Sequence, residues 1–115
     1  MLIDFDSNEH EPIKWLKVMA DYECGLWDYE GCGFDLEDLG APQGLIERFN
    51  SWLLWQYQEL DRPEDFDREA FTLEGRHLAE AIKEVVGPDV EVVYYDEVKN
   101  VNRPVEAPQI LERIE

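Results

Sequence analysis

Two amphipathic segments in the middle of the chain constrain its fold more than any other feature. Residues 42–60 and 67–86 each repeat apolar side chains at the spacing of one helical face. Pro42 suits the first turn of a helix, whereas Pro63 cannot lie inside one, so the two segments form separate helices. An apolar helix face must be buried against another layer. The sequence therefore predicts a helical hairpin that covers a sheet.

The first predicted helix has one broad apolar face and two large side chains outside it. The apolar face comprises Leu45, Ile46, Phe49, Trp52, Leu53, Tyr57 and Leu60. Leu54 and Trp55 point away from the centre of that face. In the second helix, which Asp65 or Asp67 caps, Gly75 costs about 1 kcal/mol relative to alanine. We expect a close approach of the first helix at Gly75 to offset this cost.

Alternating segments on either side of the helices predict strands. These segments are residues 13–20 and 90–95. In the first of them, Leu16 and Val18 lie on one face and Trp15 on the other. Residues 25–31 fit either a short additional strand or part of a long loop. The predicted fold class is α+β, with a small antiparallel sheet of two or three strands that the helical hairpin covers on one face.

The length of 115 residues fits a single domain, residues 1–115, with three parts. Residues 1–12 have the pattern of an extended arm, residues 13–98 hold the predicted core, and residues 99–115 form a tail that contains two prolines. We expect the tail to end in a short helical turn and to be ordered against a partner or a symmetry mate.

The charge of the chain restricts its binding partners. It has 28 acidic and 10 basic residues, which gives a formal net charge of −18. Nucleic acids and anionic membranes bind basic surfaces, so we expect no direct contact with either. No apolar run is long enough to cross a bilayer, and the acidic start lacks the pattern of a signal peptide. These features predict a cytoplasmic protein that attracts cationic partners.

The cysteines and histidines do not form a recognisable chemical site. We expect Cys24 and Cys32 to be free thiols in the cytosol, although a disulfide between them would close the loop in an oxidising compartment. Their spacing is not that of a zinc knuckle, and His10 and His77 lie on separate segments. The surrounding carboxylates raise the pKa of a thiol, which disfavours a nucleophile paired with His77. We therefore predict no catalytic residue, no metal, no cofactor and no enzymatic activity.

The segment 21–38, DYECGLWDYEGCGFDLED, is the strongest candidate for a binding site. It holds seven carboxylates interleaved with aromatic residues and contains no Lys or Arg. Aromatics among charges are typical of the centre of a protein interface, although the same pattern fits a solvated loop that buries Trp27. The predicted partner-binding residues are Asp21, Glu23, Trp27, Asp28, Tyr29, Glu30, Asp35, Glu37, Asp38 and Trp55.

Three stretches of the chain carry a resemblance to a known group of proteins. These are MADYECGLWD, LIERFNSWLLWQYQEL and FTLEGRHLAEAIKEVVGPDVEVVYYDE, which together span residues 19–97. They resemble a widespread set of small acidic bacterial proteins without assigned activity. That set is similar in kind to bacterial immunity proteins, which neutralise secreted toxins that are often basic nucleases.

The resemblance and the charge favour a non-enzymatic, acidic protein-binding module. The leading hypothesis is an immunity-type inhibitor of a basic bacterial toxin or nuclease. A DNA mimic that occupies the site of a nucleic-acid-binding protein fits the charge equally well, but it should carry regular rows of acids and few anchoring aromatics. An open sheet edge or the tail would also permit a homodimer. A deep polar pocket with converging Cys24, His77 or Tyr94 would instead favour an enzyme.

Overall fold

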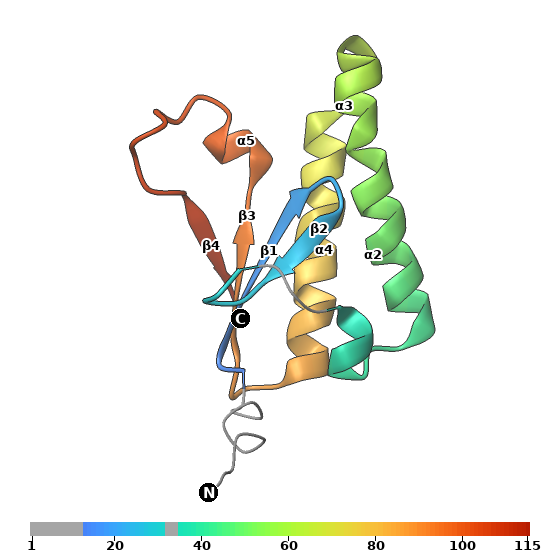
Figure 1. Ribbon diagram of the computed structural model, residues 1–115, viewed down its shortest axis with the longest axis vertical. Helices are drawn as coiled ribbons and strands as arrows, with labels where there is room; N and C mark the ends of the chain where they lie inside the picture. Colours follow the sequence, from blue (N-terminus) through green and yellow to red (C-terminus); the bar gives the residue numbers. More distant parts are fainter. Residues whose placement is uncertain (1–12, 32–34) are drawn as a thin grey trace, which may run out of the picture.

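The computed structural model describes residues 13–31 and 35–115. Figure 1 shows a helical layer beside a sheet, with the C-terminus at the sheet side. The elements are β1 (Trp15–Asp21), β2 (Cys24–Trp27), the 3-10 turn η1 (Leu36–Leu39), α2 (Gln43–Trp55), α3 (Tyr57–Asp61), the 3-10 turn η2 (Pro63–Asp65), α4 (Arg68–Val86), β3 (Glu91–Tyr95), α5 (Glu97–Asn100) and β4 (Leu111–Ile114). The predicted arm, residues 1–12, lies outside the described residues.

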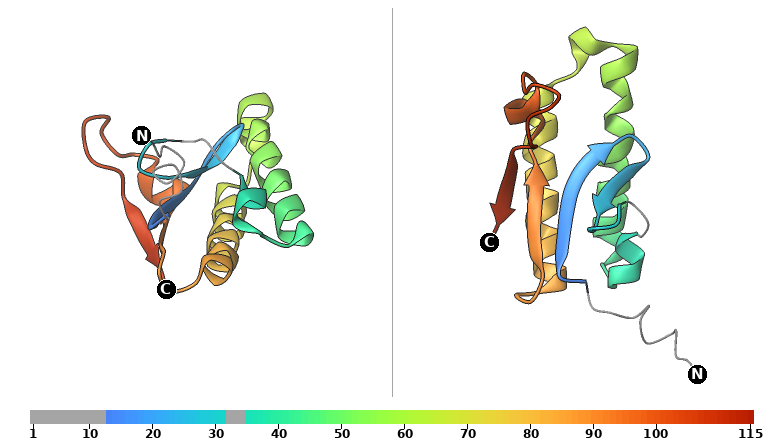
Figure 2. Two further views of the ribbon diagram at one scale, coloured as in Figure 1. Left: turned by 60° about the horizontal axis from the view of Figure 1, so that its bottom comes forward. Right: turned by 60° about the vertical axis from the view of Figure 1, so that its left-hand side comes forward.

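The sheet has four strands in the order β2-β1-β3-β4, and α2 and α4 both pack on one of its faces (Figure 2). The α+β class and the helical hairpin are confirmed. The prediction of an antiparallel sheet with two or three strands is wrong in both respects. Strand β1 pairs with β3 in parallel, and the other two strand pairs are antiparallel.

The parallel central pair follows from the number of chain reversals. A strand, two antiparallel helices and a strand would bring the second strand back antiparallel to the first. The β1–β2 hairpin adds one reversal before α2, so β3 runs in the same direction as β1 (Figure 1). The sequence of residues 25–31 fits either a short strand or part of a long loop. In the fold the strand forms, and β2 ends at Trp27. The direction of β3 depends on that short strand.

The fourth strand comes from the predicted tail. Residues 111–114 form β4 and pair with β3 of the same chain, where the sequence predicts a helical turn ordered by a partner. Asn100 fixes the connection between them: its buried amide donates to the carbonyls of Asp96 and Ile110 and accepts from the Ile110 amide. The apolar residues of β4 therefore have an intramolecular partner that their short sequence does not reveal.

The first predicted helix is divided at Gln56. Most of its predicted apolar face is buried, but Leu60, near the end of α3, is 63 % exposed. Gln56 is only 4 % exposed, since its side chain accepts from the Tyr22 amide and donates to the Ala20 carbonyl. Tyr22 has a φ of 62° in the tight β1–β2 turn. The Gln56 side chain, at the break between α2 and α3, thus holds this turn.

The helices meet the sheet at Gly75 of α4. A Cβ atom added at Gly75 would lie 2.3 Å from the Tyr94 hydroxyl oxygen and 2.5 Å from Cζ2 of Trp52. The Trp52 indole stacks on Phe71 at 4.9 Å, and its N–H donates to the Phe71 carbonyl at 2.9 Å. The Tyr94 hydroxyl donates to the Thr72 carbonyl at 3.1 Å. The expected close approach at Gly75 is confirmed, and the sheet takes part in it.

Replacement of Gly75 by alanine should destabilise the fold even though alanine favours helices. Overpacking beside Trp52 and Tyr94 should lower the free energy of unfolding by about 2 kcal/mol, as measured by urea denaturation. Gly44→Ala in α2 is the matched control, because a Cβ there meets nothing within 4 Å. It should raise stability by roughly 0.5 kcal/mol. A Gly75→Ala variant as stable as Gly44→Ala would contradict the packing described here.

Candidate partner-binding surface

The sheet face turned away from α2 and α4 carries an aromatic pair. Leu16 and Val18 of β1 are buried in the core. Trp15, which is half-buried, therefore lies on the opposite face of the sheet, as predicted. The rings of Trp15 and Tyr29 stack at 4.8 Å with an interplanar angle of 10°. Tyr29 is nevertheless 77 % exposed. A rigid, exposed aromatic ring of this kind is available to a partner at little entropic cost.

Trp27 lies on the same face and is half-buried. Its indole N–H donates to the Met19 carbonyl at 3.0 Å, and the Lys17 ammonium lies 5.3 Å from the centre of its ring. Lys17 also donates to the Gln109 side chain, and burial lowers its pKa. Trp27 therefore combines the two readings of the sequence, because part of its ring is fixed by the sheet and part remains accessible.

The predicted carboxylates surround this hairpin, and nearly all of them are exposed. Asp28 is half-buried, where its carboxylate accepts from the Glu30 amide at 2.8 Å. Asp38 accepts from the Asp35 amide at 2.9 Å, which closes the 3-10 turn η1. The exposed carboxylates are Asp21, Glu23, Glu30, Asp35, Glu37 and Asp38. The segment that carries them has no basic residue, so it presents uncompensated negative charge.

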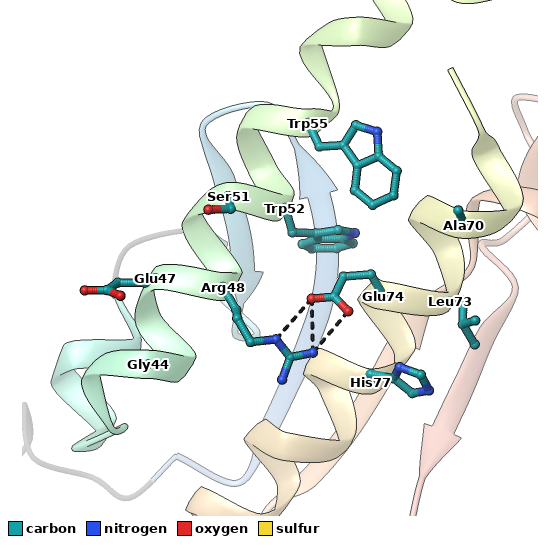
Figure 3. Close-up of a pocket in the computed structure, with 10 residues that line it drawn as sticks. All are labelled: Gly44, Glu47, Arg48, Ser51, Trp52, Trp55, Ala70, Leu73, Glu74 and His77. Atoms are coloured by element: carbon teal, nitrogen blue, oxygen red, sulfur yellow. Dashed lines mark hydrogen bonds and ion pairs between the residues drawn. The ribbon is translucent and has the colours of Figure 1, made fainter. Parts of the chain in front are cut away.

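Trp55 is separated from Trp27 and Tyr29. It lines a cleft of about 540 Å³ between α2 and α4, on the helical layer (Figure 3). Its ring packs edge-on against Phe71 at 5.4 Å and Phe66 at 6.4 Å. The structure thus divides the predicted partner-binding residues between two places. One is the acidic hairpin, residues 21–31, together with the neighbouring η1, and the other is the cleft that contains Trp55.

The cleft contains charges that neutralise one another. The Arg48 guanidinium spans from α2 to Glu74 of α4 and bonds both carboxylate oxygens at 3.0 Å (Figure 3). His77 and Ser51 also line the cleft. Because its most prominent charges are paired, the cleft offers less net attraction to a cation than the hairpin does.

An additional acidic cluster, which the sequence does not reveal, lies where β1, α3 and α5 meet. Burial is the main cause that raises the pKa of Glu97 to about 7, followed by repulsion from Glu59, whereas Arg68 acts in the opposite direction. Asp96 and Asp21 add smaller repulsions. The Arg68–Glu59 ion pair offsets part of this charge. Only the folded chain brings these distant positions together.

The cysteine prediction requires correction. Cys24 is disulfide-bonded, so the expected free thiol is wrong there, and Cys32 lies outside the described residues. Cys24, His77 and Tyr94 do not converge: Cys24 follows the β1–β2 turn, His77 lines the α2–α4 cleft, and Tyr94 is buried in the core. Among residues 13–31 and 35–115, no group of three or more His, Cys, Asp or Glu side chains could hold a metal ion.

Comparison with known families identifies the group to which these features belong. Residues 14–97 match the family described as Serratia CdiI immunity protein-like. The chain belongs to this family. No curated protein and no solved structure gives a match. The resemblance to immunity proteins noted in the sequence is thereby confirmed.

The matched region of this CdiI-like protein runs from β1 to the start of α5. It includes the acidic hairpin, η1, the α2–α4 cleft and the core junction at Gly75, whereas β4 lies outside it. In the part of the chain that the structure describes, no helix is long and apolar enough to cross a membrane.

The stability of this protein should fall as pH rises through 7 because of Glu97. Its pKa is 4.5 in the unfolded chain and about 7 in the folded protein. Folding therefore takes up a proton at pH values between these two. That stabilisation is complete below about pH 4.5 and lost above about pH 7. Since Glu97 is only part-buried, we expect the loss to be about 1–2 kcal/mol.

Urea denaturation at pH 5 and pH 8 measures this loss. Glu97→Gln should be less sensitive to pH than the wild type, while Glu106→Gln, at an exposed loop position, should keep the wild-type dependence. Identical pH dependence in the wild type and Glu97→Gln would contradict the assignment to Glu97.

Proposed function

We propose that this chain is a non-enzymatic immunity protein that binds a basic toxin and blocks it. The observation that carries the proposal is an acidic hairpin with the exposed aromatic Tyr29 in a member of the Serratia CdiI immunity protein-like family. The hairpin and η1 hold exposed carboxylates that no basic residue of the segment compensates. Toxins that act on nucleic acids need cationic clefts, and a surface of opposite charge fits such clefts.

Two physical effects contribute to binding in this proposal. The negative field of the whole molecule, with its net charge of −18, accelerates the encounter with a cationic partner. Tyr29, held by its stack on Trp15, then loses water against the partner and slows dissociation. The charge therefore acts on the association rate and the aromatics on the dissociation rate.

The aromatic pair also favours protein recognition over DNA mimicry. A mimic needs carboxylates placed as phosphates are, and large exposed rings contribute nothing to that spacing. Tyr29 stands between Asp28 and Glu30 in the sequence, and its ring stacks on Trp15. A cationic protein surface uses both features, because arginine side chains stack on aromatic rings and bond carboxylates.

The test uses a toxin domain of the source bacterium, and the product of the neighbouring gene is the first one to examine. The wild-type protein should bind it and protect cells that express it, and the association rate should fall about tenfold or more between about 50 and 500 mM salt. Tyr29→Ala should weaken binding by roughly tenfold, mainly through faster dissociation. Leu54→Ala, at a residue of α2 that is 69 % exposed, is the control and should bind as the wild type does.

Failure to bind the toxin domain would overturn the proposal. Equal binding by Tyr29→Ala and the wild type would place the contact elsewhere on the molecule. Competition between this protein and DNA for an unrelated DNA-binding protein, without toxin binding, would favour the mimic.

A further inference from the structure

A small pocket with an apolar floor and an acidic rim lies between β2, η1 and α2. Its volume is about 190 Å³. The buried side chains of Leu26 and Phe49 lie at its floor. The exposed carboxylates of Glu23, Asp35 and Glu37 line its mouth. None of the described residues that line it is Lys or Arg, so the charges that these residues contribute are all negative.

The packing of β2 on α2 brings these groups together. A Cβ atom at Gly25 would lie 2.6 Å from Cζ of Phe49 and 2.8 Å from Cδ2 of Leu53, so β2 approaches α2 more closely here than a side chain would allow. Glu23 precedes this contact by two residues. The capping interaction between Asp35 and Asp38 fixes η1 on the other side of the pocket.

The chemistry of the pocket matches a long cationic side chain. Lys and Arg combine an apolar stem with a charged head, so such a side chain lying across the pocket places its stem on the apolar floor and its head at the acidic rim. The pocket is smaller than those that enclose drug-sized ligands, and its volume corresponds to roughly six water molecules. The α2–α4 cleft is larger, but Arg48 and Glu74 already pair across it.

We propose that this pocket receives one Lys or Arg side chain of the toxin. This inference rests on the proposed function and specifies one contact within it. The side chain lies across the pocket, so that its stem covers Phe49 and displaces water from the floor while its head meets the rim carboxylates. The rim is solvated in the free protein, so the carboxylates there are not buried before the cation arrives. The contact combines apolar burial with charge, as the strongest interface residues do.

Two neighbouring substitutions on α2 test whether the toxin contacts the acidic pocket or the α2–α4 cleft. Asn50 is exposed and lines the acidic pocket, whereas Ser51 is exposed and lines the α2–α4 cleft. Asn50→Trp should fill the pocket and weaken binding of the toxin domain by about tenfold or more. Ser51→Trp should leave binding within about twofold of the wild type. The reverse result would overturn the proposal.

Charge removal gives a second test that does not alter the shape of α2. A variant with Glu23→Gln, Asp35→Asn and Glu37→Gln should dissociate about tenfold faster from the toxin domain. Its control carries Asp61→Asn, Glu64→Gln and Asp65→Asn, which make the same charge change at exposed positions. The control should lower the association rate only. Equal dissociation rates for the two variants would contradict a specific role for the pocket.

A titration without the toxin separates this inference from the proposed function. Adding N-acetyl-arginine amide or N-acetyl-lysine amide should produce saturable NMR shifts at Asn50 and Leu53, whereas the uncharged citrulline analogue should not. Shifts spread evenly over the surface carboxylates, or none at the pocket, would overturn the pocket and leave toxin binding standing. Saturable shifts at the pocket together with no toxin binding would overturn the proposed function and retain the cation site.

Discussion

The contact at Gly75 joins the two long helices to the sheet. Trp52 of α2 and Tyr94 of β3 both approach the bare backbone of α4 at this point. Their polar groups bond the carbonyls of Phe71 and Thr72, so neither large side chain leaves a buried donor unpaired. Because this junction holds both long helices against one face of the sheet, the opposite face and the β1–β2 hairpin remain available for other contacts.

Local patterns in the sequence predict the elements that this junction joins, but not how the chain connects them. Helical spacing identifies α2 and α4, and alternation identifies β1 and β3, because each pattern reflects burial on one side. Strand β2 has only four residues, and β4 has its apolar residues in a segment with no clear period. Such short strands are stabilised by pairing with neighbours, which no local pattern reports. The parallel direction of β3 depends on β2, and so it too escapes sequence reasoning.

The candidate site shows the same division. The carboxylates of residues 21–38 are exposed, with the exception of the half-buried Asp28, because charged groups favour contact with water. The helical pattern puts Trp55 outside the core face of its helix and so groups it with Trp27 and Tyr29, yet the fold places it in the α2–α4 cleft. The partners of these aromatics, Trp15 and Lys17, come from β1 and are found only through strand register. Surface chemistry is thus predictable residue by residue, while its grouping requires the fold.

In the proposed function, the acidic hairpin, η1 and the pocket between them form the face that meets a basic toxin. Hydrogen–deuterium exchange of this protein, alone and in complex with the toxin domain, tests this placement of the contact. The account predicts that binding slows exchange of backbone amides in residues 21–31 and 35–39 and leaves the rim of the α2–α4 cleft unchanged. Slower exchange along the cleft or at β4, with no change in the hairpin, would contradict it.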